Sequence, residues 1–282
     1  MKALSSDSED YPRALLDLRD PPHPLWLEGD AGVLSRRAVS IVGTRRMTPY
    51  GARVARELAT AFASAGIVVV SGLAQGIDSA AHEGALEAGG ISVAVVGAGL
   101  EAFLADSRGR RGALAQRIRD SGALVSEFPP DAPARTWTFA KRDATIAALG
   151  EITVVVEAPA GSGALITADE AHRLGRTVYA VPGPLGARTS VGTNALIAEG
   201  RARAITSVPM VLDAMGASAT TLRVDRDPIG ARILEALAPA PADPDALARR
   251  LGLRPAQLTT EVARLVVSGE VVCGADGRLA RR

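Results

Sequence analysis

The sequence predicts an α/β protein with a doubly wound, mostly parallel sheet of the extended Rossmann-like type, followed by a small C-terminal winged-helix domain. Short apolar runs alternate along the chain with amphipathic helical segments, which is typical of right-handed βαβ units. The runs lack polar alternation, as expected for strands that helices cover on both faces. The 282 residues are 47% hydrophobic, which suffices for one full α/β domain and a smaller second one.

One strand–loop–helix unit is central to this pattern. The apolar run Ile67–Ser71 is followed by a loop that contains Gly72 and Gly76, and an amphipathic helix begins near Asp78. Glycine permits positive φ and close backbone approach, and the free N–H groups at the start of a helix bind phosphate. A tight turn without any ligand is equally compatible with this stretch alone.

The remaining elements follow in the same alternation. The expected strands are Ala38–Gly43, Ile91–Gly97, Ala123–Glu127, Glu151–Ala158 and Thr177–Val181, and the expected helices are Thr48–Gly66, Asp78–Ala88, Gly112–Ser121, Asp143–Leu149 and Ser162–Gly175. Together they define a Rossmann-like domain over residues 38–215. Residues 1–37 contain the proline-rich stretch Asp20–Trp26 and are expected to form an irregular cover at one edge.

The C-terminal part of the chain has a different pattern. Residues 216–228 are small and polar and are expected to form a linker. Residues 229–282 read as three short helices and two brief strands, the pattern of a winged helix-turn-helix. Its expected recognition helix, Ala256–Val267, has Arg264 as its one basic residue, so protein contact and weak DNA contact are equally compatible with it.

Composition limits the environment of the protein. The net charge of +1 gives no global field toward nucleic acid or membrane, so any polyanion site must be local. The lone Cys273 excludes an internal disulfide, as in a reducing cytosol. The first 20 residues lack the apolar core of a signal peptide, and no apolar run is long enough to span a bilayer. We therefore expect a soluble, cytoplasmic protein without membrane insertion.

No catalytic, metal or cofactor site is expected. Val96–Ala102 matches G-x-G-x-x-A, but a loop-like stretch follows the glycines where a dinucleotide site needs a helix. The three histidines, His23, His82 and His172, lie far apart in the sequence, and with one cysteine they do not suggest zinc. The sequence contains neither a P-loop nor a G-x-S-x-G motif. The protein is therefore not expected to be an enzyme.

An anion-binding geometry recurs instead at three predicted strand ends. Loops at Gly43–Arg46, Ser71–Gly76 and Gly161–Gly163 each follow a strand and precede a helix. Because the carboxyl ends of parallel strands lie along one edge, these loops could contact successive phosphates of one nucleic-acid strand. Phe139 could stack on a base beside two cations. The candidate DNA-binding residues are Arg45, Arg46, Ser71, Gly72, Gly76, Phe139, Lys141, Arg142, Ser162 and Gly163.

Longer blocks resemble the DNA-processing protein family DprA, also called Smf. The resemblance covers roughly residues 20–210, with the family's frequent winged-helix appendage after them. The blocks are Ser40–Arg46 (SIVGTRR), Ser71–Leu86 (SGLAQGIDSAAHEGAL), Leu124–Pro130 (LVSEFPP), Val154–Arg176 (VVVEAPAGSGALITADEAHRLGR) and Val178–Ile197 (VYAVPGPLGARTSVGTNALI).

The resemblance implies a homodimeric, non-catalytic protein that binds single-stranded DNA. Members protect incoming DNA during natural transformation, help to displace single-strand-binding protein and load the RecA recombinase. By position, Arg45 and Arg46 would contact phosphates and the Ser71–Gly76 and Ser162–Gly163 loops would supply N–H donors. Lys141 and Arg142 would form the opposite wall, and Ser190, Gly192 and Asn194 would support the structure.

The chain departs from the family pattern at one wall of this site. The stretch after Leu100, Glu101–Arg108, lacks the usual Tyr-Pro and Asn, and Asp143 and Ala144 stand where the family has Asn and Arg. This wall therefore loses a positive charge and gains a negative one. Three nearby arginines either compensate or form a solvated loop, namely Arg108, Arg110 and Arg111. An N-terminal helical domain found in many members is also absent or vestigial.

Two other functions are compatible with the sequence. A Rossmann-type nucleotide or phosphoribosyl hydrolase would use the same loops for one phosphate, with Glu127 or Glu157 as acid or base. A transcription regulator would use the winged helix on duplex DNA and the α/β domain as a sensor.

Overall fold

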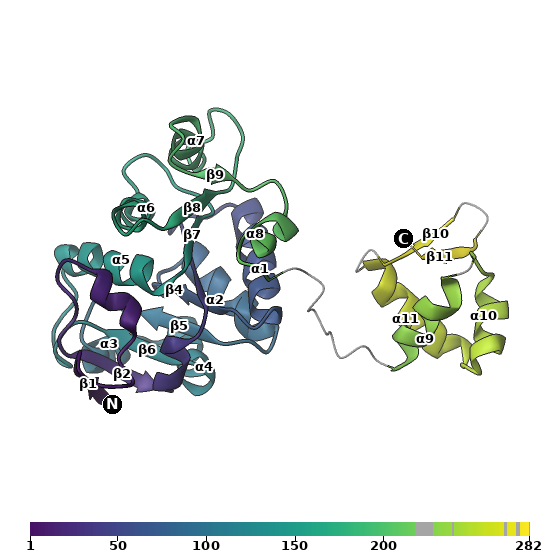
Figure 1. The fold of residues 1–282 in the computed structure, drawn as a ribbon, viewed down its shortest axis with the longest axis horizontal. Helices are drawn as coiled ribbons and strands as arrows, with labels where there is room; N and C mark the ends of the chain where they lie inside the picture. The colour runs from purple at the N-terminus through teal and green to yellow at the C-terminus, as the bar shows by residue number, and fades with distance from the viewer. Residues whose placement is uncertain (218–227, 239, 268–269, 275–276, 282) are drawn as a thin grey trace. The chain divides into compact units, whose positions relative to one another are not determined.

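The computed structural model describes residues 1–217, 228–238, 240–267, 270–274 and 277–281. It divides the chain into two compact units, Met1–Leu222 and Arg223–Arg282 (Figure 1). The predicted linker, residues 216–228, lies for the most part outside the described residues.

Within the described residues, nine strands form one sheet in the first unit. Its order is β1-β2-β6-β5-β4-β3-β7-β8-β9. The pairs β1–β2 and β2–β6 are antiparallel and all other neighbours are parallel, which confirms the predicted doubly wound, mostly parallel sheet. The strands are β1 Lys2–Leu4, β2 Leu25–Gly29, β3 Ala38–Val42, β4 Val68–Ser71, β5 Ser92–Val95, β6 Ala123–Ser126, β7 Ile152–Val155, β8 Thr177–Ala180 and β9 Arg203–Ala204.

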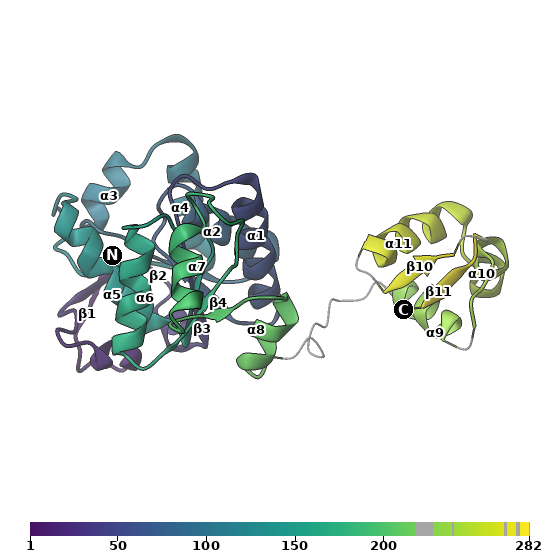
Figure 2. The same cartoon turned by 90° about the horizontal axis from the view of Figure 1, so that it is seen from above.

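Helices cover both faces of this sheet (Figures 1 and 2). The helices are α1 Pro49–Ser64, α2 Ile77–Glu87, α3 Leu100–Asp106, α4 Gly109–Ser121, α5 Thr136–Leu149, α6 Gly163–Arg173, α7 Val191–Ala198 and α8 Val208–Ala214, with 3-10 turns η1 Arg13–Asp17 and η2 Ala31–Ser35. Val68 and Val70 share a core cluster with side chains of α5 and α6, whereas Val69 shares one with α1 and α2. The β4 strand is thus buried on both faces, as its uninterrupted apolar sequence predicts.

The order in which successive strands are added to the sheet reverses beside β3. From β3 the sheet grows through β4 and β5 to β6, and α5 then returns the chain to β7 on the other side of β3. The strands β3 and β7 pair in parallel, with Ser40 opposite Thr153. Their carboxyl ends are therefore neighbours whose loops lead in different directions, which is the switch point where α/β proteins bind ligands.

The N-terminal segment is part of the sheet, so the expectation of an irregular cover was wrong for its two strands. In β2, Leu27 pairs with Val125 of β6, and Leu25 and Leu27 are fully buried while Trp26 between them is partly exposed. The prolines end at Pro24, immediately before this strand. They do not prevent the alternation that follows them from pairing.

Two helices differ from the prediction. The stretch expected to be a loop after Leu100 forms α3, but its first amides are occupied because Gly99 N donates to Ala132 O and Ala102 N to Pro130 O. Helix α5 begins at Thr136 and not at Asp143. Because α5 starts early, its two basic residues, Lys141 and Arg142, both lie on the helix. Their positions along the helix then determine the direction in which each side chain points.

The second unit has the expected winged-helix pattern. It contains α9 Pro228–Leu237, α10 Pro244–Leu251 and α11 Pro255–Val267, followed by the antiparallel pair β10 Val271–Cys273 and β11 Leu279–Arg281. Its own core includes Ile233, Leu247 and Leu258. The side chain of Arg264 lies outside the described part of this unit. None of the described helices in either unit has the length and apolar character that a membrane span needs.

The incorporation of β2 into the sheet predicts a large cost for truncating it. We expect Leu27→Ala to lower the free energy of unfolding by about 2–5 kcal/mol, because the fully buried side chain would leave a cavity. The matched control Leu16→Ala removes the same atoms from a side chain that is 43% exposed and should change stability by about 0.5 kcal/mol or less. Equal effects in urea denaturation would contradict the placement of β2.

Candidate functional site

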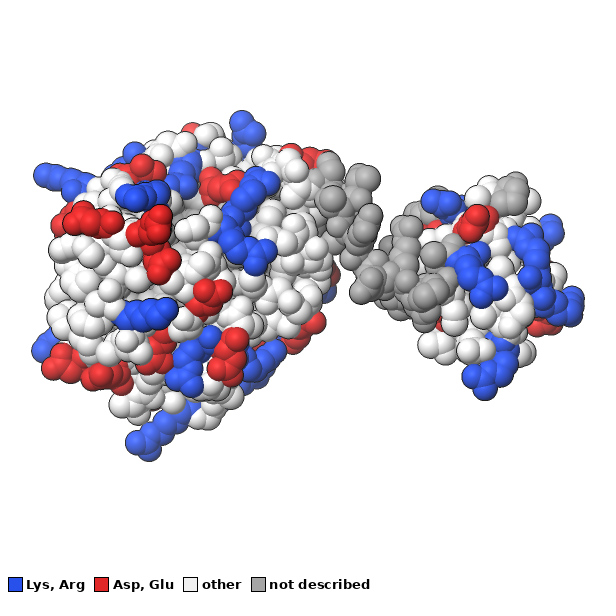
Figure 3. All heavy atoms as spheres, turned by 60° about the horizontal axis from the view of Figure 1, so that its bottom comes forward, with Lys and Arg blue, Asp and Glu red and all other residues white. Residues whose placement is uncertain are grey.

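Neither sign of charge dominates the face of the first unit that Figure 3 shows. On the face shown in Figure 3, acidic and basic side chains are interspersed over the larger unit. A polyanion would therefore have to be recognised by a local arrangement.

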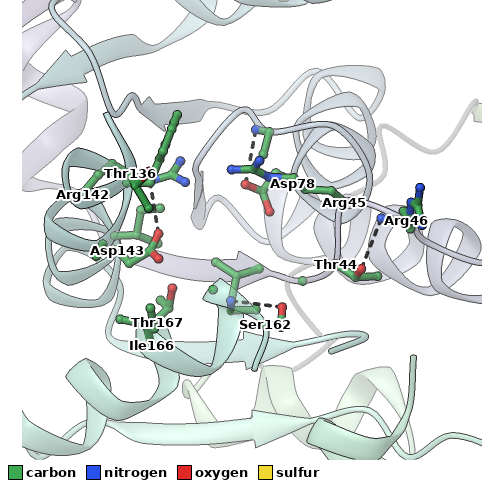
Figure 4. A pocket seen from close by; sticks show the side chains of 18 residues that line it. Thr44, Arg45, Arg46, Asp78, Thr136, Arg142, Asp143, Ser162, Ile166 and Thr167 are labelled. Carbon is green, nitrogen blue, oxygen red and sulfur yellow. Dashed lines mark hydrogen bonds and ion pairs between the residues drawn. The ribbon is translucent and has the colours of Figure 1, made fainter. Parts of the chain in front are cut away.

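A pocket of about 670 Å³ opens at the carboxyl ends of β3 and β7. It is formed by the loop after β3, the start of α2, the first half of α5 and the start of α6. Figure 4 shows Thr136, Arg142 and Asp143 on one side and Thr44 and Arg46 on the other. The polar residues of its lining are Thr44, Arg45, Arg46, Asp78, Thr136, Arg142, Asp143, Ser162 and Thr167.

Backbone contacts fix the loop after β3. Thr44 N donates to Glu157 O over 2.7 Å, and Ile77 N donates to Thr44 O over 3.2 Å. Gly76, at φ +92°, makes this approach feasible, since a Cβ there would lie 2.3 Å from Thr44 O. The loop is thus held between the end of β7 and the start of α2, and the side chains of Arg45 and Arg46 extend from it in exposed positions.

The Arg45 side chain lies above an aromatic ring. Its guanidinium carbon is 5.3 Å from the centre of the half-buried Phe139 ring, within range of a cation–π contact. Phe139 itself lies close to Gly97, where a Cβ would come within 2.7 Å of the ring. This packing orients Arg45 beside the pocket.

The start of α6 supplies the second anion-binding feature. Ser162 caps the helix by accepting from Ala164 N over 3.4 Å, and Gly163 is exposed. The first amides of a helix and its dipole favour a negative charge at this position. The pocket therefore combines two exposed guanidinium groups with a helix N-terminus.

A buried guanidinium lies between two buried carboxylates on the α5 side. Arg142 Nη1 donates to Gly72 O over 2.6 Å and to Val95 O over 3.1 Å, and Arg142 Nε is 3.1 Å from Asp143 Oδ1. Asp78, Arg142 and Asp143 are only 5%, 6% and 7% exposed. Arg142 thus ties α5 to the ends of β4 and β5 and is already engaged. Arg142 lines the pocket, so it lies in a wall of the site as predicted, but without Lys141 beside it.

Burial governs the ionisation of these carboxylates. Burial, with a smaller contribution from the charge of Asp78, raises the pKa of Asp143 to about 7, while Arg142 and Arg45 oppose the change. Burial also raises the pKa of Asp78, against the effect of Arg142. The charge of the pocket therefore changes with pH near neutrality, through the residue that replaces the family's Asn.

Of the loop after β4, Ala74 lines the pocket, whereas Ser71, Gly72 and Gly76 do not. Ser71 is buried and its hydroxyl donates to Ile41 O over 2.6 Å, and Gly72 lies beneath the guanidinium of Arg142. Gly76 is buried against Thr44. One amide of this loop is also engaged, since Ala74 N donates to Asp78 Oδ2. Ser71, Gly72 and Gly76 are therefore structural here.

Lys141 lies in a neighbouring hollow and not in the pocket. Its Nζ is 2.9 Å from Asp20 Oδ2 and 3.8 Å from Glu127 Oε2. Burial raises the pKa of Glu127 to about 7, although the hydrogen bond from Thr145 and the charge of Lys141 oppose the change. The structure thus separates Lys141 from Arg45, Arg46, Phe139, Ser162 and Gly163, which line the pocket.

Arg110 and Arg111 belong to the first turn of α4 and not to a solvated loop. Arg110 pairs with Glu83 at 3.1 Å. Arg111 lies 4.6 Å above the Phe103 ring, and its pKa is lowered by burial and, more weakly, by repulsion from Arg142 and Arg45. Arg111 therefore adds positive potential on the side where Asp143 adds negative charge.

Neither of the glutamates considered as a hydrolytic acid or base lines the pocket. Glu157 accepts from Thr48 N over 2.9 Å and from Thr48 Oγ1 over 2.5 Å, at the start of α1. Gly51 leaves room for it, since a Cβ there would lie 2.3 Å from Glu157 Oε2. Glu127 faces the hollow of Lys141. No group of three or more His, Cys, Asp or Glu in the described residues could hold a metal ion.

Sequence reasoning missed Asp78 and Thr136 as pocket residues. Asp78 was expected only to mark the start of a helix, and its burial beside Arg142 depends on how α5 packs. Thr136 lay in a stretch that was not expected to be helical. The sequence did contain a signal that Asp78 lines the pocket. This carboxylate comes two residues after Gly76, at the start of the helix that faces the loop after β3.

Comparisons with known proteins agree on one family. The sequence matches the family described as DNA recombination-mediator protein A over residues 2–216 and the DprA winged helix domain over residues 217–277. Protein Smf of Escherichia coli (strain K12) is 40% identical over 197 residues, 70% of this chain and 52% of that protein. The chain thus spans about half the length of that relative.

Two solved structures have a similar fold. DNA processing protein A (DprA) from Streptococcus pneumoniae superimposes with a TM-score of 0.69 at 34% identity, over 75% of this chain and 73% of that one. DNA processing protein A from Helicobacter pylori, described for its unique single-stranded DNA binding mode, gives a TM-score of 0.68 at 28% identity, over 76% of this chain and 94% of that one.

The buried carboxyl of Asp143 predicts a pH dependence of stability. An unfolded aspartate has a pKa of about 3.9, so the folded state retains a proton at Asp143 between about pH 4 and pH 7 and loses stability as pH rises through this window. We expect Asp143→Asn to gain stability relative to the wild type across that range, by about 1.4 kcal/mol per unit of pKa shift at most.

Urea denaturation at pH 5 and pH 8 measures this difference, and both tryptophans, Trp26 and Trp137, report on the first unit. The exposed control Asp131→Asn should leave the slope of the wild type intact. A parallel pH profile for Asp143→Asn would contradict the burial argument.

Proposed function

This chain belongs to the DNA recombination-mediator protein A family, and from that premise we propose that it is a single-stranded DNA-binding recombination mediator. The observation that carries the proposal is the placement of two exposed arginines, Arg45 and Arg46, beside the N-terminus of α6 at the switch point of the sheet. The similarity to the Helicobacter pylori protein, which was solved for its single-stranded DNA binding mode, supports it.

The pocket favours phosphate contacts that do not depend on base identity. Arg45 and Arg46 offer forked donors, and the first amides of α6 at Gly163 offer backbone donors. Phe139 lies beneath Arg45 and supports its guanidinium at the edge of the pocket. These contacts converge in a recess between α5 and α6, which suits a flexible single strand better than a rigid duplex.

The proposal includes the wider role of the family. The protein would protect incoming DNA during natural transformation, act with single-strand-binding protein and the RecA recombinase, and work as a homodimer in the cytoplasm. The family resemblance supports these partners. No catalytic step is proposed, because neither Glu127 nor Glu157 lines the pocket that would hold a phosphate.

A hydrolase remains the alternative that one observation favours. Asp143 lies in the pocket with a pKa of about 7, as a general acid or base at neutral pH would. Release of ribose or base from nucleoside monophosphates, abolished by Asp143→Asn, would support this alternative. We expect no release above the background.

A salt titration with the full chain tests the DNA-binding function. Fluorescence anisotropy would compare a labelled dT oligomer with a duplex of the same length. We expect the single strand to bind more tightly and log K to fall linearly with log salt, with a slope of about −0.7 per phosphate contact. Preference for the duplex would favour the transcription-regulator hypothesis, and absence of binding would reject the proposed function.

Removal of both exposed arginines should weaken this binding. We expect Arg45→Ala/Arg46→Ala to lower the affinity for the dT oligomer at least tenfold, about 1.4 kcal/mol, and to reduce the salt slope. Arg117→Ala is the matched control, because Arg117 is an exposed arginine on α4 outside the pocket. An unchanged affinity of the folded double variant would reject the site.

A further inference from the structure

A large aromatic side chain is exposed at the mouth of the pocket. Trp137 is 61% exposed and follows Thr136, which lines the pocket, in the first turn of α5. An exposed side chain of this size and type is unusual for a purely structural residue. The function described so far does not use it.

The Trp137 ring is held in place from one side. It contacts the buried Phe128 edge-to-face, with 5.6 Å between the ring centres and 81° between the planes. Such aromatic pairs are favourable beyond the area that they bury. The ring is therefore fixed by Phe128 while much of its surface remains available to a ligand.

Helix geometry places Trp137 between two hollows. Successive residues of a helix are rotated by about 100°. Thr136, Ala140 and Asp143 line the pocket of Arg45, whereas Lys141 and its neighbours line the adjacent hollow of about 580 Å³. Trp137 lies one turn before Lys141 on the same side of α5, so a strand that leaves the pocket across α5 would meet these two residues in turn.

Lys141 is available to such a strand. Its closer partner Asp20 is an exposed carboxylate, with a side chain 81% accessible to water, while its second partner, the buried Glu127, lies 3.8 Å away and would stay in place. Exposed ion pairs contribute little to stability, so exchanging Asp20 for a phosphate would cost little. An aromatic ring with a cation one helical turn later can stack on a base while the cation contacts a neighbouring phosphate.

Resting on the proposed function, we propose that Trp137 is a base-stacking residue that extends the single-stranded DNA path out of the pocket and across α5, with Lys141 contacting the next phosphate. The site takes an unpaired nucleobase of any kind, since every base has a π face. It therefore adds affinity for DNA with bases but none for the sugar–phosphate backbone alone.

Intrinsic fluorescence reads this contact directly. The chain has two tryptophans, so the variant Trp26→Phe leaves Trp137 as the only emitter. We expect a dT oligomer to quench this emission, and an abasic oligomer of the same length to bind with little quenching. In Trp137→Phe, where Trp26 emits, the dT oligomer should produce little change.

Affinity provides the second measurement. We expect Trp137→Ala to weaken binding of the dT oligomer about tenfold and to leave binding of the abasic oligomer unchanged, while Trp137→Phe retains most of the affinity. Anisotropy detects binding independently of tryptophan emission.

The outcomes separate this inference from the proposed function. If the dT oligomer binds to Trp26→Phe without quenching the emission, the stacking role is overturned and the DNA-binding function stands. This result is also expected if Trp137 contacts a protein partner and not DNA. Equal losses of affinity for both oligomers in Trp137→Ala would also overturn it. No binding of either oligomer would overturn both proposals.

Discussion

The hydrogen bond from Thr44 N to Glu157 O joins the two strand ends between which the pocket opens. It brings the loop after β3 against the end of β7, and the Glu157 side chain extends the link to Thr48 at the start of α1. Gly76 then allows α2 to close on the same loop. Because the loop is fixed in this way, Arg45 and the first amides of α6 face one pocket without a rearrangement that a ligand would have to drive.

The same pocket contains charges of both signs. Arg142 is retained inside by two carbonyl groups and lies between Asp78 and Asp143, so that side of the pocket has little positive charge to offer. Attraction for a polyanion must then come from Arg45, Arg46 and the helix N-terminus, with Arg111 nearby. A rise of the Asp143 pKa to about 7 reduces the repulsion that its carboxylate would otherwise exert on a phosphate. Asp143 therefore reduces the attraction of the pocket for a phosphate less than an exposed aspartate at this position would.

The sequence predicted the sheet better than it predicted the site. The β4–α2 unit could be read closely because a strand buried on both faces is an uninterrupted apolar run. The β2 strand was missed because prolines precede its alternation. The site depends on where α5 begins, and there Arg135 is the N-cap residue, whose N–H donates to the Thr138 hydroxyl. Because α5 starts at Thr136, the Arg142 side chain points into the fold and the Lys141 side chain points away from the pocket. The sequence shows only two adjacent basic residues and does not reveal that their side chains point in different directions.

We propose that phosphates of a single strand lie between the loop after β3 and the start of α6. The most direct measurement is the change in backbone amide chemical shifts of the full chain on addition of a dT oligomer. We expect the largest chemical-shift changes at the amides of Arg45, Arg46, Ser162 and Gly163, because the oligomer would approach them. Changes confined to α4 or to the winged-helix unit, with these four amides unaffected, would contradict it.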